Sequence, residues 1–283
     1  MKKVLITGVN GLLGRYLTSL LRKDFEVVGL TSQLSDNSSN LYFDFMSSFY
    51  TKSLPRDVDI ICHLAQAPNH QENFENYSDI FRINTVSTQI LLDYGSQIGI
   101  EKFFFASSGS IYDSGSQPSG ESDKFEVYSK TFYAKSKLFS ESMARSYEDR
   151  FQIAIGRIFF MFGKNQRENF LIPSLVKKIE QQLPIFLSGE NGIDINPLSA
   201  SECAEMIKFL LVGELNGIFN MCGNERISLR KLAEVIGGIL GTEPIFEVRE
   251  PAVNVLGDNS KILRSGYIYK STSLKDEIAS AIL

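Results

Sequence analysis

The residues best suited to chemistry are a tyrosine and a lysine four positions apart, Tyr133 and Lys137, and a serine upstream of them, Ser108. Reducing a ketone, or oxidising an alcohol, requires a hydride at carbon and a proton at oxygen, so a protein whose cofactor handles the hydride must supply a proton carrier. A tyrosine ordinarily titrates near pH ~10, and a nearby ammonium favours its anion. Because a spacing of four places both side chains on one helical face, we expect Lys137 to lower the pKa of Tyr133.

A glycine-rich segment near the amino terminus is suited to binding a phosphate group. The apolar run VLIT leads into TGVNGLLG at residues 7–14, and a helical pattern follows. Gly8 allows a tight turn, Gly11 allows the backbone to approach a pyrophosphate, and Gly14 allows close packing of helix against strand. A helix N-terminus also presents free N–H groups and a partial positive charge. This pattern predicts a dinucleotide-binding loop.

The residue expected to hold the adenosine ribose is unusual. An acidic side chain normally stands about 20 residues beyond the glycines. Here that position is Thr31, and Arg15 lies just after the loop. Because a threonine does not repel a 2′-phosphate, the pattern favours NADP, with NAD as the alternative.

These candidate residues lie in a regular alternation of short apolar runs and longer helical patterns, which extends to about residue 140. Runs such as VDIICHL and KFFFAS are almost uninterrupted, as expected for central strands covered on both faces. The alternation predicts an α/β fold, a doubly wound parallel sheet of the Rossmann type. We expect residues 1–160 to form the NAD(P)-binding domain with the catalytic helix. Residues 161–283 are expected to form a small C-terminal substrate-binding cap, interleaved with the last sheet strands.

Composition excludes several other functions. A formal net charge of -4 argues against nucleic acid as a partner. Cys62, Cys203 and Cys222 are widely spaced, which argues against a metal site and a disulfide framework and indicates buried apolar side chains. The first apolar run ends at Gly8, too early for a signal peptide or a membrane span. We expect no membrane association and a cytoplasmic location.

Taken together, the motifs resemble those of the extended short-chain dehydrogenase/reductase family, the NAD-dependent epimerase/dehydratase group that acts mostly on nucleotide-sugars. The resemblance covers nearly the whole chain and rests on TGVNGLLG, Asp44-Phe45, His63-Leu64-Ala65-Gln66-Ala67, Asn84, SSGSIY at 107–112 and Tyr133-Ala134-Lys135-Ser136-Lys137.

The resemblance implies a role for each matching residue. Lys137 holds the nicotinamide ribose beside the catalytic Tyr133, while Ser108 orients the reacting oxygen. Asp44 and Phe45 meet the adenine. His63 and His70 are expected to be structural. The full set of expected cofactor-binding residues is Gly8, Asn10, Gly11, Leu12, Leu13, Gly14, Thr31, Asp44, Phe45, Leu64, Ala65, Asn84, Ser107, Tyr133 and Lys137.

Residues that are missing narrow the reaction. Dehydratases of the family carry an Asp-Glu pair after the catalytic hydroxyl, where this chain has Gly109 and Ser110. Epimerases that act beside a ketone need further acid/base groups, yet no histidine follows His70. Two reactions remain, reduction of a 4-keto sugar and epimerisation at the same carbon. The NADP pattern and the short chain favour the reductase.

The substrate side departs from the family pattern. Phe160 occupies a position where the family often has an asparagine that binds substrate phosphate, and Arg249 is the remaining candidate for the diphosphate. With Ser108 and Ser110, these are the expected substrate-binding residues. A smaller carbonyl substrate and a non-catalytic NAD(P)-sensing protein are the alternatives. The apolar faces near Asn84 and Lys137 predict a homodimer.

Overall fold

The computed structural model of the protein describes residues 1–33, 40–47, 51–68, 74–113, 115–128, 130–249, 254–270 and 273–283. The chain forms two compact units. The first consists of Met1–Ile111, Phe125–Arg157 and Ala204–Phe219; the second consists of Tyr112–Lys124, Ile158–Cys203 and Asn220–Leu283. Every segment expected to bind the dinucleotide or to do chemistry belongs to the first unit.

A seven-stranded sheet forms the centre of the Rossmann-like fold. Its strands are β1 (Lys3–Thr7), β2 (Glu26–Thr31), β3 (Leu41–Tyr42), β4 (Ile60–His63), β5 (Lys102–Ser108), β6 (Gln152–Ile158) and β11 (Gly217–Met221). They lie in the order β11-β6-β5-β4-β1-β2-β3, and the pairs β1/β2, β2/β3, β1/β4 and β4/β5 are parallel. The predicted doubly wound parallel sheet is therefore confirmed.

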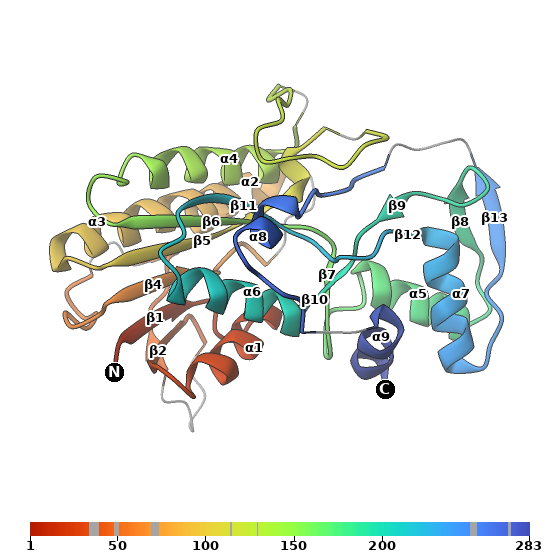
Figure 1. The fold of residues 1–283 in the computed structure, drawn as a ribbon, viewed down its shortest axis with the longest axis horizontal. Helices are drawn as coiled ribbons and strands as arrows, with labels where there is room; N and C mark the ends of the chain where they lie inside the picture. The colour runs from red at the N-terminus through yellow and green to blue at the C-terminus, as the bar shows by residue number, and fades with distance from the viewer. Residues whose placement is uncertain are drawn as a thin grey trace. The chain divides into compact units, whose positions relative to one another are not determined.

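Helices cover both faces of this sheet, which explains the apolar strands. The helices of the first half are α1 (Leu12–Leu21), η1 (Phe74–Asn76), α2 (Tyr77–Ile80), η2 (Phe81–Val86), α3 (Ser87–Ile98), η3 (Gly109–Ile111) and α4 (Phe132–Arg145). Figure 1 shows α3 and α4 on one side of the sheet and α1 and α6 on the other. Phe103, Phe104 and Phe105 of β5 are consequently buried, although their side chains alternate between the two faces.

Local signals set the ends of the helices that matter for the site. The Thr131 side chain accepts a hydrogen bond from the Ala134 N–H and so caps the start of α4. Helix α3 ends at Gly99, whose φ of 76° is the left-handed conformation that glycine tolerates best. Since α4 begins at Phe132, both Tyr133 and Lys137 lie in its first two turns.

The second unit has its own core and shorter strands. Its elements are β7 (Met161–Phe162), α5 (Leu171–Glu180), β8 (Ile185–Ser188), β9 (Asp194–Ile195), β10 (Leu198–Ser199), α6 (Ala200–Val212, shared with the first unit), β12 (Ile227–Ser228), α7 (Leu229–Leu240), β13 (Phe246–Arg249), α8 (Ser260–Arg264) and α9 (Leu274–Ile282). Helices α5, α7 and α9 contribute Leu175, Ile236 and Ile278 to one apolar cluster. This cluster supports the parallel pair β8/β13.

Two further expectations can be compared with the described residues. All three cysteines are free and buried, as predicted. None of the helices in the described residues is both long enough and apolar enough to cross a membrane.

Candidate active site

The strand order places a ligand site beside β1. The chain adds β2 and β3 on one side of β1 and then continues with β4 on the other, so the order reverses between β1 and β4. In open α/β sheets, ligands bind outside the carboxyl ends of the strands at such a switch point. The glycine-rich segment follows β1, and Leu64 and Ala65 follow β4, so both expected cofactor segments begin at this point.

The glycine loop has the close backbone contacts that its sequence predicts. Gly8 has a φ of 72°, and a Cβ there would lie 2.9 Å from the Ala65 nitrogen. A Cβ on Gly14 would lie only 2.1 Å from the Gly8 carbonyl oxygen. The N-cap of α1 is Gly11, so no side chain caps the first N–H groups of the helix. These glycines keep the backbone bare where a pyrophosphate would approach, and the residues fit a dinucleotide.

Polar contacts connect this loop to the end of β2. The Asn10 side chain donates to Thr31 Oγ1 over 2.8 Å, and an Arg15 guanidinium N–H donates to the Asn10 carbonyl over 2.9 Å. Thr31 Oγ1 also exchanges hydrogen bonds with the backbone of Gln33. Arg15 and Thr31 therefore both contact Asn10.

A buried histidine holds the two strand ends together. The N–H groups of residues 64 and 65 both donate to Thr7 Oγ1, so the Thr7 hydrogen is directed to His63 Nδ1, 2.8 Å away. His63 Nε2 must then carry the ring proton and donate to Ser87 Oγ, which donates onward to a backbone carbonyl. Burial, followed by the charge of Lys137, lowers the pKa of His63 to about 3. His63 is therefore structural, as expected, whereas His70 lies outside the described residues.

Asn84 connects the segment after β4 to α4, the helix that bears Tyr133 and Lys137. It lies in η2, a π-helical turn, and is almost fully buried. Its Oδ1 accepts from the Ala67 N–H over 2.9 Å, and its Nδ2 donates to Ser136 Oγ over 3.0 Å. Its carbonyl oxygen accepts from the Ser140 hydroxyl. A π-helical turn frees backbone groups for such contacts and is frequent at functional sites.

The three residues expected to do chemistry lie together at the carboxyl end of β5. Ser108 forms a hydrogen bond with the Tyr133 hydroxyl, which in turn donates to Gln66 Oε1 over 3.0 Å. Ser108 Oγ lies 2.9 Å from Ser110 Oγ. Lys137 Nζ donates to the Ala106 carbonyl over 2.8 Å and lies 5.7 Å from the centre of the Tyr133 ring.

The pKa values differ from the expectation drawn from spacing alone. Burial raises the pKa of Tyr133 to about 12, with the Ser108 hydrogen bond acting in the opposite direction. Burial also lowers the pKa of Lys137 to about 7, against the charge of Glu141, which raises it. Desolvation penalises the charged form of each group, and in the ligand-free protein it outweighs the expected attraction between ammonium and phenolate. Tyr133 is therefore protonated at neutral pH.

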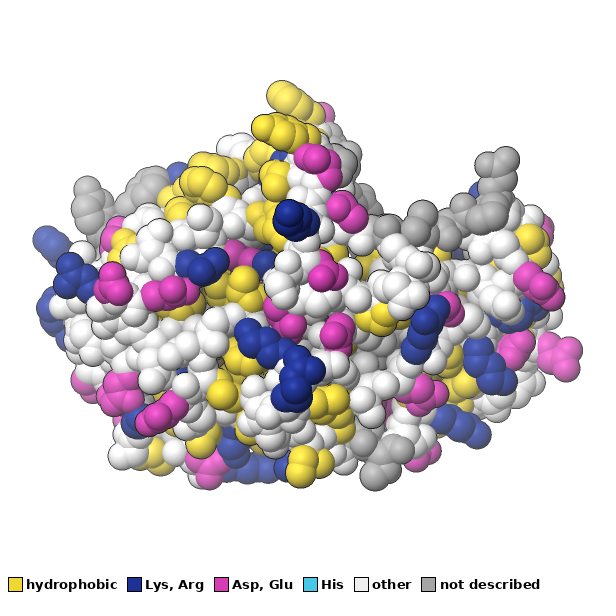
Figure 2. Space-filling view, turned by 45° about the horizontal axis from the view of Figure 1, so that its top comes forward, with side chains coloured by type: hydrophobic (Ala, Val, Ile, Leu, Met, Phe, Trp, Pro, Cys, Tyr) yellow, Lys and Arg dark blue, Asp and Glu magenta, His cyan; other side chains and the backbone are white. Residues whose placement is uncertain are grey.

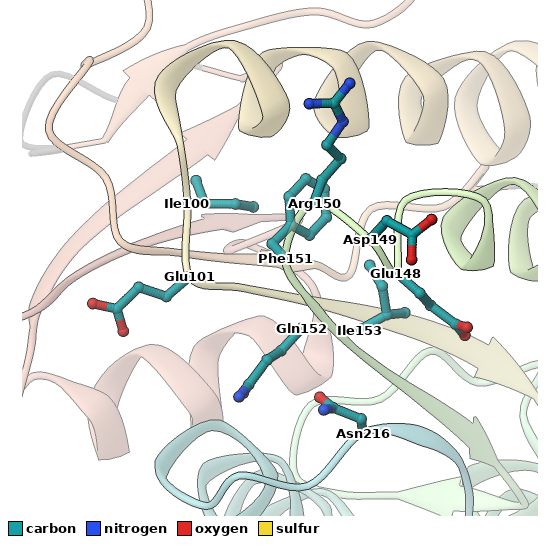
Figure 3. Close-up of a pocket in the computed structure, with 9 residues that line it drawn as sticks. All are labelled: Ile100, Glu101, Glu148, Asp149, Arg150, Phe151, Gln152, Ile153 and Asn216. Carbon is teal, nitrogen blue, oxygen red and sulfur yellow. The ribbon is translucent and has the colours of Figure 1, made fainter.

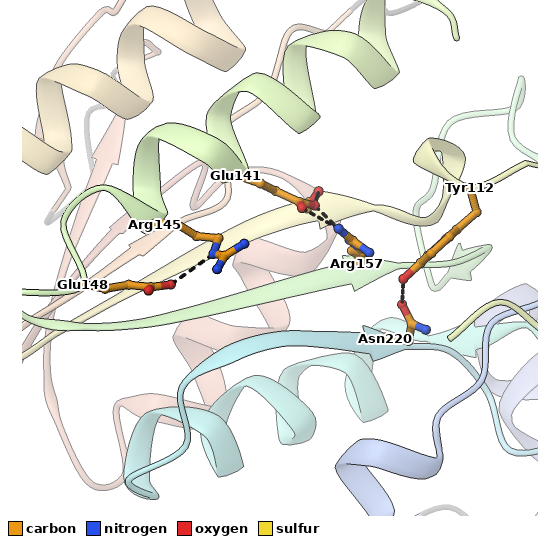
Figure 4. Close-up of polar contacts among 7 residues, drawn as sticks. Tyr112, Glu141, Arg145, Glu148, Arg157 and Asn220 are labelled. Carbon is orange, nitrogen blue, oxygen red and sulfur yellow. Dashed lines mark hydrogen bonds and ion pairs between the residues drawn. The ribbon is translucent and has the colours of Figure 1, made fainter. Parts of the chain in front are cut away.

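A buried ion pair lies one turn beyond Lys137 on α4. Arg157 of β6 donates to both carboxylate oxygens of Glu141, over 2.7 Å and 3.1 Å, and the two side chains are 4% and 5% exposed (Figure 4). The Ser107 hydroxyl donates to the same carboxylate. Because Ser107 precedes Ser108, this pair holds the strand end that bears Ser108.

Asp44 and Phe45, which the sequence predicted to contact the adenine, differ in their surroundings. The Phe45 ring packs against Phe43 and His63 in the core, and the Asp44 carboxylate accepts from the Met46 N–H and the Ser47 hydroxyl.

Phe160 and Arg249 belong to the second unit. Phe160 has a φ of 34°, a left-handed conformation that is strained for a bulky side chain and that asparagine adopts more readily. The Arg249 guanidinium lies 3.4 Å from the centre of the Phe186 ring.

A cavity of about 470 Å³ also opens in the first unit, at the amino ends of β5 and β6 (Figure 3). Glu101, Phe151 and Asn216 are among its lining residues. Ser108, Tyr133 and Lys137 are not among its lining residues, and ligands of doubly wound sheets bind at the opposite, carboxyl ends of the strands.

Sequence reasoning missed three residues of the site, namely Gln66, Glu141 and Arg157. Gln66 lies within the motif after β4, but that motif gave no sign that its amide contacts Tyr133. Glu141 lies four residues beyond Lys137, a helical spacing that was available as a signal. Arg157 lies in an apolar strand, where a lone cation indicates a buried partner.

Known proteins resemble the chain over its whole length. A "Uncharacterized UDP-glucose epimerase YtcB" from Bacillus subtilis is 27% identical, with 99% of this chain and 96% of that protein covered. A "GDP-6-deoxy-D-talose 4-dehydrogenase" from Aggregatibacter actinomycetemcomitans is 26% identical, with coverage of 96% and 94%. The crystal structure of UDP-glucuronic acid 4-epimerase from Bacillus cereus in complex with NAD has the same fold, with a TM-score of 0.86, 23% identity and coverage of 99% and 95%.

The family model described as NAD dependent epimerase/dehydratase family matches residues 4–222. That span contains the glycine loop, the segment after β4 and the catalytic helix. The chain therefore belongs to the NAD-dependent epimerase/dehydratase family of enzymes, the extended short-chain dehydrogenase/reductases that act on nucleotide-sugars.

Proposed function

We propose that the protein reduces the 4-keto group of a nucleoside-diphosphate sugar, using NADPH. The observation that carries this proposal is the meeting of Ser108, Tyr133 and Lys137 at the end of β5. Tyr133 supplies the proton that the substrate oxygen gains. Because its pKa of about 12 keeps it protonated at neutral pH, the free enzyme is ready to act as the acid that a ketone reduction needs.

Each side chain has a separate role in this reaction. A bound nicotinamide supplies the hydride to the carbon of the ketone. Ser108 donates a hydrogen bond to the substrate oxygen and orients it. Tyr133 then transfers its proton to that oxygen. Lys137 holds the nicotinamide ribose, and in its charged form it stabilises the phenolate that remains.

The proposed cofactor preference rests on the end of β2. Thr31 carries no charge to repel a 2′-phosphate, and Arg15 reaches Asn10, which also contacts Thr31. The other proposed cofactor contacts come from the glycine loop, from residues 44–45 and 64–65, and from Asn84 and Ser107. We expect the affinity for NADPH to exceed that for NADH.

The proposed substrate-binding residues are Ser108, Ser110, Phe160 and Arg249. Ser108 and Ser110 offer hydroxyl groups at the end of β5. Arg249 offers a guanidinium for the diphosphate, held by its contact with the Phe186 ring. The strained backbone at Phe160 supports a substrate role for this position, because strain of this kind concentrates at functional sites.

A second candidate is epimerisation at C4 with a permanently bound NAD. It is favoured by the name of the Bacillus subtilis relative and needs no residue that the chain lacks. An epimerase regenerates its cofactor in each turnover, whereas a reductase releases it.

The nucleotide that leaves the purified protein on denaturation separates the two reactions. An empty site that binds NADPH more tightly than NADH is the result expected for the reductase. Stoichiometric NAD, together with interconversion of C4 epimers, would instead establish the epimerase. Turnover of small ketones but not of nucleotide-sugars would assign a smaller substrate, and cofactor binding with no turnover of any carbonyl compound would assign a sensor.

We also propose that the protein is a homodimer. Phe81 of η2 and Phe139 of α4 are 46% and 55% exposed, respectively. On the face shown in Figure 2, hydrophobic side chains gather over α4 and the residues just before it, while charges of both signs are interspersed elsewhere. A second copy would cover such a surface. Light scattering should give the mass of two chains at micromolar protein, and the mass of one chain would contradict the proposal.

A further inference from the structure

The backbone around Gln66 is held on both sides. The Ala65 N–H donates to Thr7 Oγ1 over 3.0 Å, and the Ala67 N–H donates to Asn84 Oδ1 over 2.9 Å. The residue between them is therefore fixed at its Cα, although its side chain is exposed. From this position the Gln66 amide reaches the Tyr133 hydroxyl, with its Oε1 accepting over 3.0 Å.

The hydrogen bonds at this site have a definite direction. The single hydrogen of the Tyr133 hydroxyl is donated to Gln66 Oε1, so in its hydrogen bond with Tyr133 the Ser108 hydroxyl is the donor. The hydroxyl of Ser110 and its backbone N–H are then the donors to Ser108 Oγ, over 2.9 Å and 3.2 Å. The chain of donors runs from Ser110 through Ser108 and Tyr133, and it ends at Gln66.

A glutamine side chain is suited to the end of this chain of hydrogen bonds because its amide oxygen accepts hydrogen bonds and its amide nitrogen donates them. Before substrate binds, Gln66 Oε1 accepts the single hydrogen of the Tyr133 hydroxyl; with substrate bound, that hydrogen turns to the substrate oxygen. Once Tyr133 has lost the proton, its oxygen needs donors, and rotation of the amide brings Nε2–H into the position of Oε1. A glutamate at residue 66 would lack that donor and would repel the phenolate.

We propose that Gln66 is a positioning residue for the catalytic tyrosine, whose amide holds the Tyr133 hydroxyl and then turns to donate to its oxygen after proton transfer. This inference rests on the proposed function. In that step the O–H bond of Tyr133 breaks and an O–H bond forms on the substrate, while the carbonyl carbon of the substrate accepts the hydride of a reduced nicotinamide. Gln66 keeps all its own protons.

Few ionisable groups surround the Tyr133 hydroxyl. Lys137 lies on the same helix, and His63 at the end of β4 is already bonded through both ring nitrogens. Glu141, one turn beyond Lys137 on α4, is paired with Arg157 of β6. From the other described elements packed against α4, the charged residues are Asp79 of α2, Arg82 of η2, Asp93 of α3 and Lys102 of β5, and η3 contributes none. Of these, Arg82 donates to the Phe45 carbonyl, Asp93 accepts from Tyr147, and Lys102 donates to carbonyls at the end of α6.

Two substitutions test the proposal, Gln66→Met and Gln66→Glu. Methionine has a similar shape without hydrogen-bonding groups, so kcat for the 4-keto sugar should fall at least tenfold at every pH. For Gln66→Glu, kcat should fall at least as far at about pH 8. This deficit should shrink toward about pH 5, because glutamic acid has an ordinary pKa of about 4.3 and its protonated form can donate again. The Kd for NADPH should stay unchanged in both variants.

A readout independent of turnover comes from tyrosine labelled with carbon-13 at Cζ, since its resonance reports hydrogen bonding and ionisation of the phenol. Tyr133→Phe assigns the Tyr133 signal, which both Gln66 variants should shift. Gln89→Glu is the matched control, because Gln89 Nε2 donates to the Tyr147 hydroxyl over 2.8 Å. It should shift only the Tyr147 signal and leave kcat unchanged.

Wild-type kcat in both Gln66 variants would overturn the proposal. So would a Gln66→Glu deficit that is the same at every pH, or an unshifted Tyr133 resonance. If the wild-type protein reduces no nucleotide-sugar while the Tyr133 resonance still responds to Gln66, the proposed function fails and the hydrogen bond stands, so the two failures are distinguishable.

Discussion

Breaking the buried pair between Glu141 and Arg157 should strongly destabilise the first unit. Both side chains are about 95% buried, and two hydrogen bonds join them. Arg157→Met removes one partner and leaves the Glu141 carboxylate as an uncompensated buried charge. Such a change typically costs about 3–5 kcal/mol, a large fraction of the stability of an ordinary domain. Glu141→Gln should cost a similar amount, because it leaves the Arg157 charge alone.

The double variant distinguishes a lost pair from general damage. Glutamine at residue 141 still accepts from Ser107, and methionine at 157 leaves no charge behind, so the two together should cost less than the sum of the single changes by a few kcal/mol, as for other residues in direct contact. A matched control is Arg145→Met, which breaks the exposed pair between Arg145, the last residue of α4, and Glu148 in the turn that follows (Figure 4). That change should cost at most about 1 kcal/mol.

Urea unfolding followed by far-ultraviolet circular dichroism is the appropriate assay, because the chain has no tryptophan. The unfolding free energies of the variants can be compared only where they decrease with urea concentration at the same slope. Because the chain has two units, the unfolding curve must also be checked for a second transition. The reasoning would be refuted if Arg157→Met cost no more than Arg145→Met, or if the two single changes were simply additive.

Three other predictions follow from the geometry. Gly14→Ala should weaken NADPH binding at least tenfold or prevent folding, because its Cβ would lie 2.1 Å from a backbone oxygen. The control is Gly238→Ala, where the Cβ meets nothing within 4 Å. It should leave NADPH binding unchanged and stabilise α7 by about 0.5–1 kcal/mol. The pKa of His63 in the folded protein is about 3, below its ordinary value of 6.5. The neutral imidazole therefore stabilises the fold at pH values above 6.5, and this stabilisation is lost as the pH falls toward 3. The urea midpoint of His63→Gln should change less between about pH 7 and pH 4 than that of the wild type. Arg15→Ala should weaken binding of NADPH more than that of NADH in fluorescence titrations, and an equal loss for both would contradict the 2′-phosphate role.

The sequence predicted the parallel sheet, the glycine loop and the placement of Tyr133 and Lys137 on one helical face, because each depends on local spacing; the role of Ser108 followed from the resemblance to the family. Periodicity located β5 and α4, and the helical spacing of four brought Tyr133 and Lys137 to one face. The match to the family model confirms the family that these motifs indicated.

Other features depend on contacts distant in sequence and could not be predicted in this way. Burial sets the pKa of Tyr133, and the spacing of two residues contains no information on burial. The contact of Gln66 with Tyr133 joins residues 67 positions apart. The π-helical turn at Asn84 and the left-handed backbone at Phe160 are also set by packing and strand geometry rather than by local sequence.

The most direct test of the proposed reaction is the absorbance of the reduced nicotinamide when the protein is mixed with NADPH and a 4-keto sugar carried on UDP, dTDP or GDP. We expect the wild-type protein to oxidise NADPH with at least one of these substrates. Tyr133→Phe should bind NADPH with the same Kd and oxidise it at least a hundredfold more slowly, given the usual contribution of a general acid. A wild-type rate in Tyr133→Phe, or no NADPH oxidation by the wild-type protein with any of the three, would contradict the account.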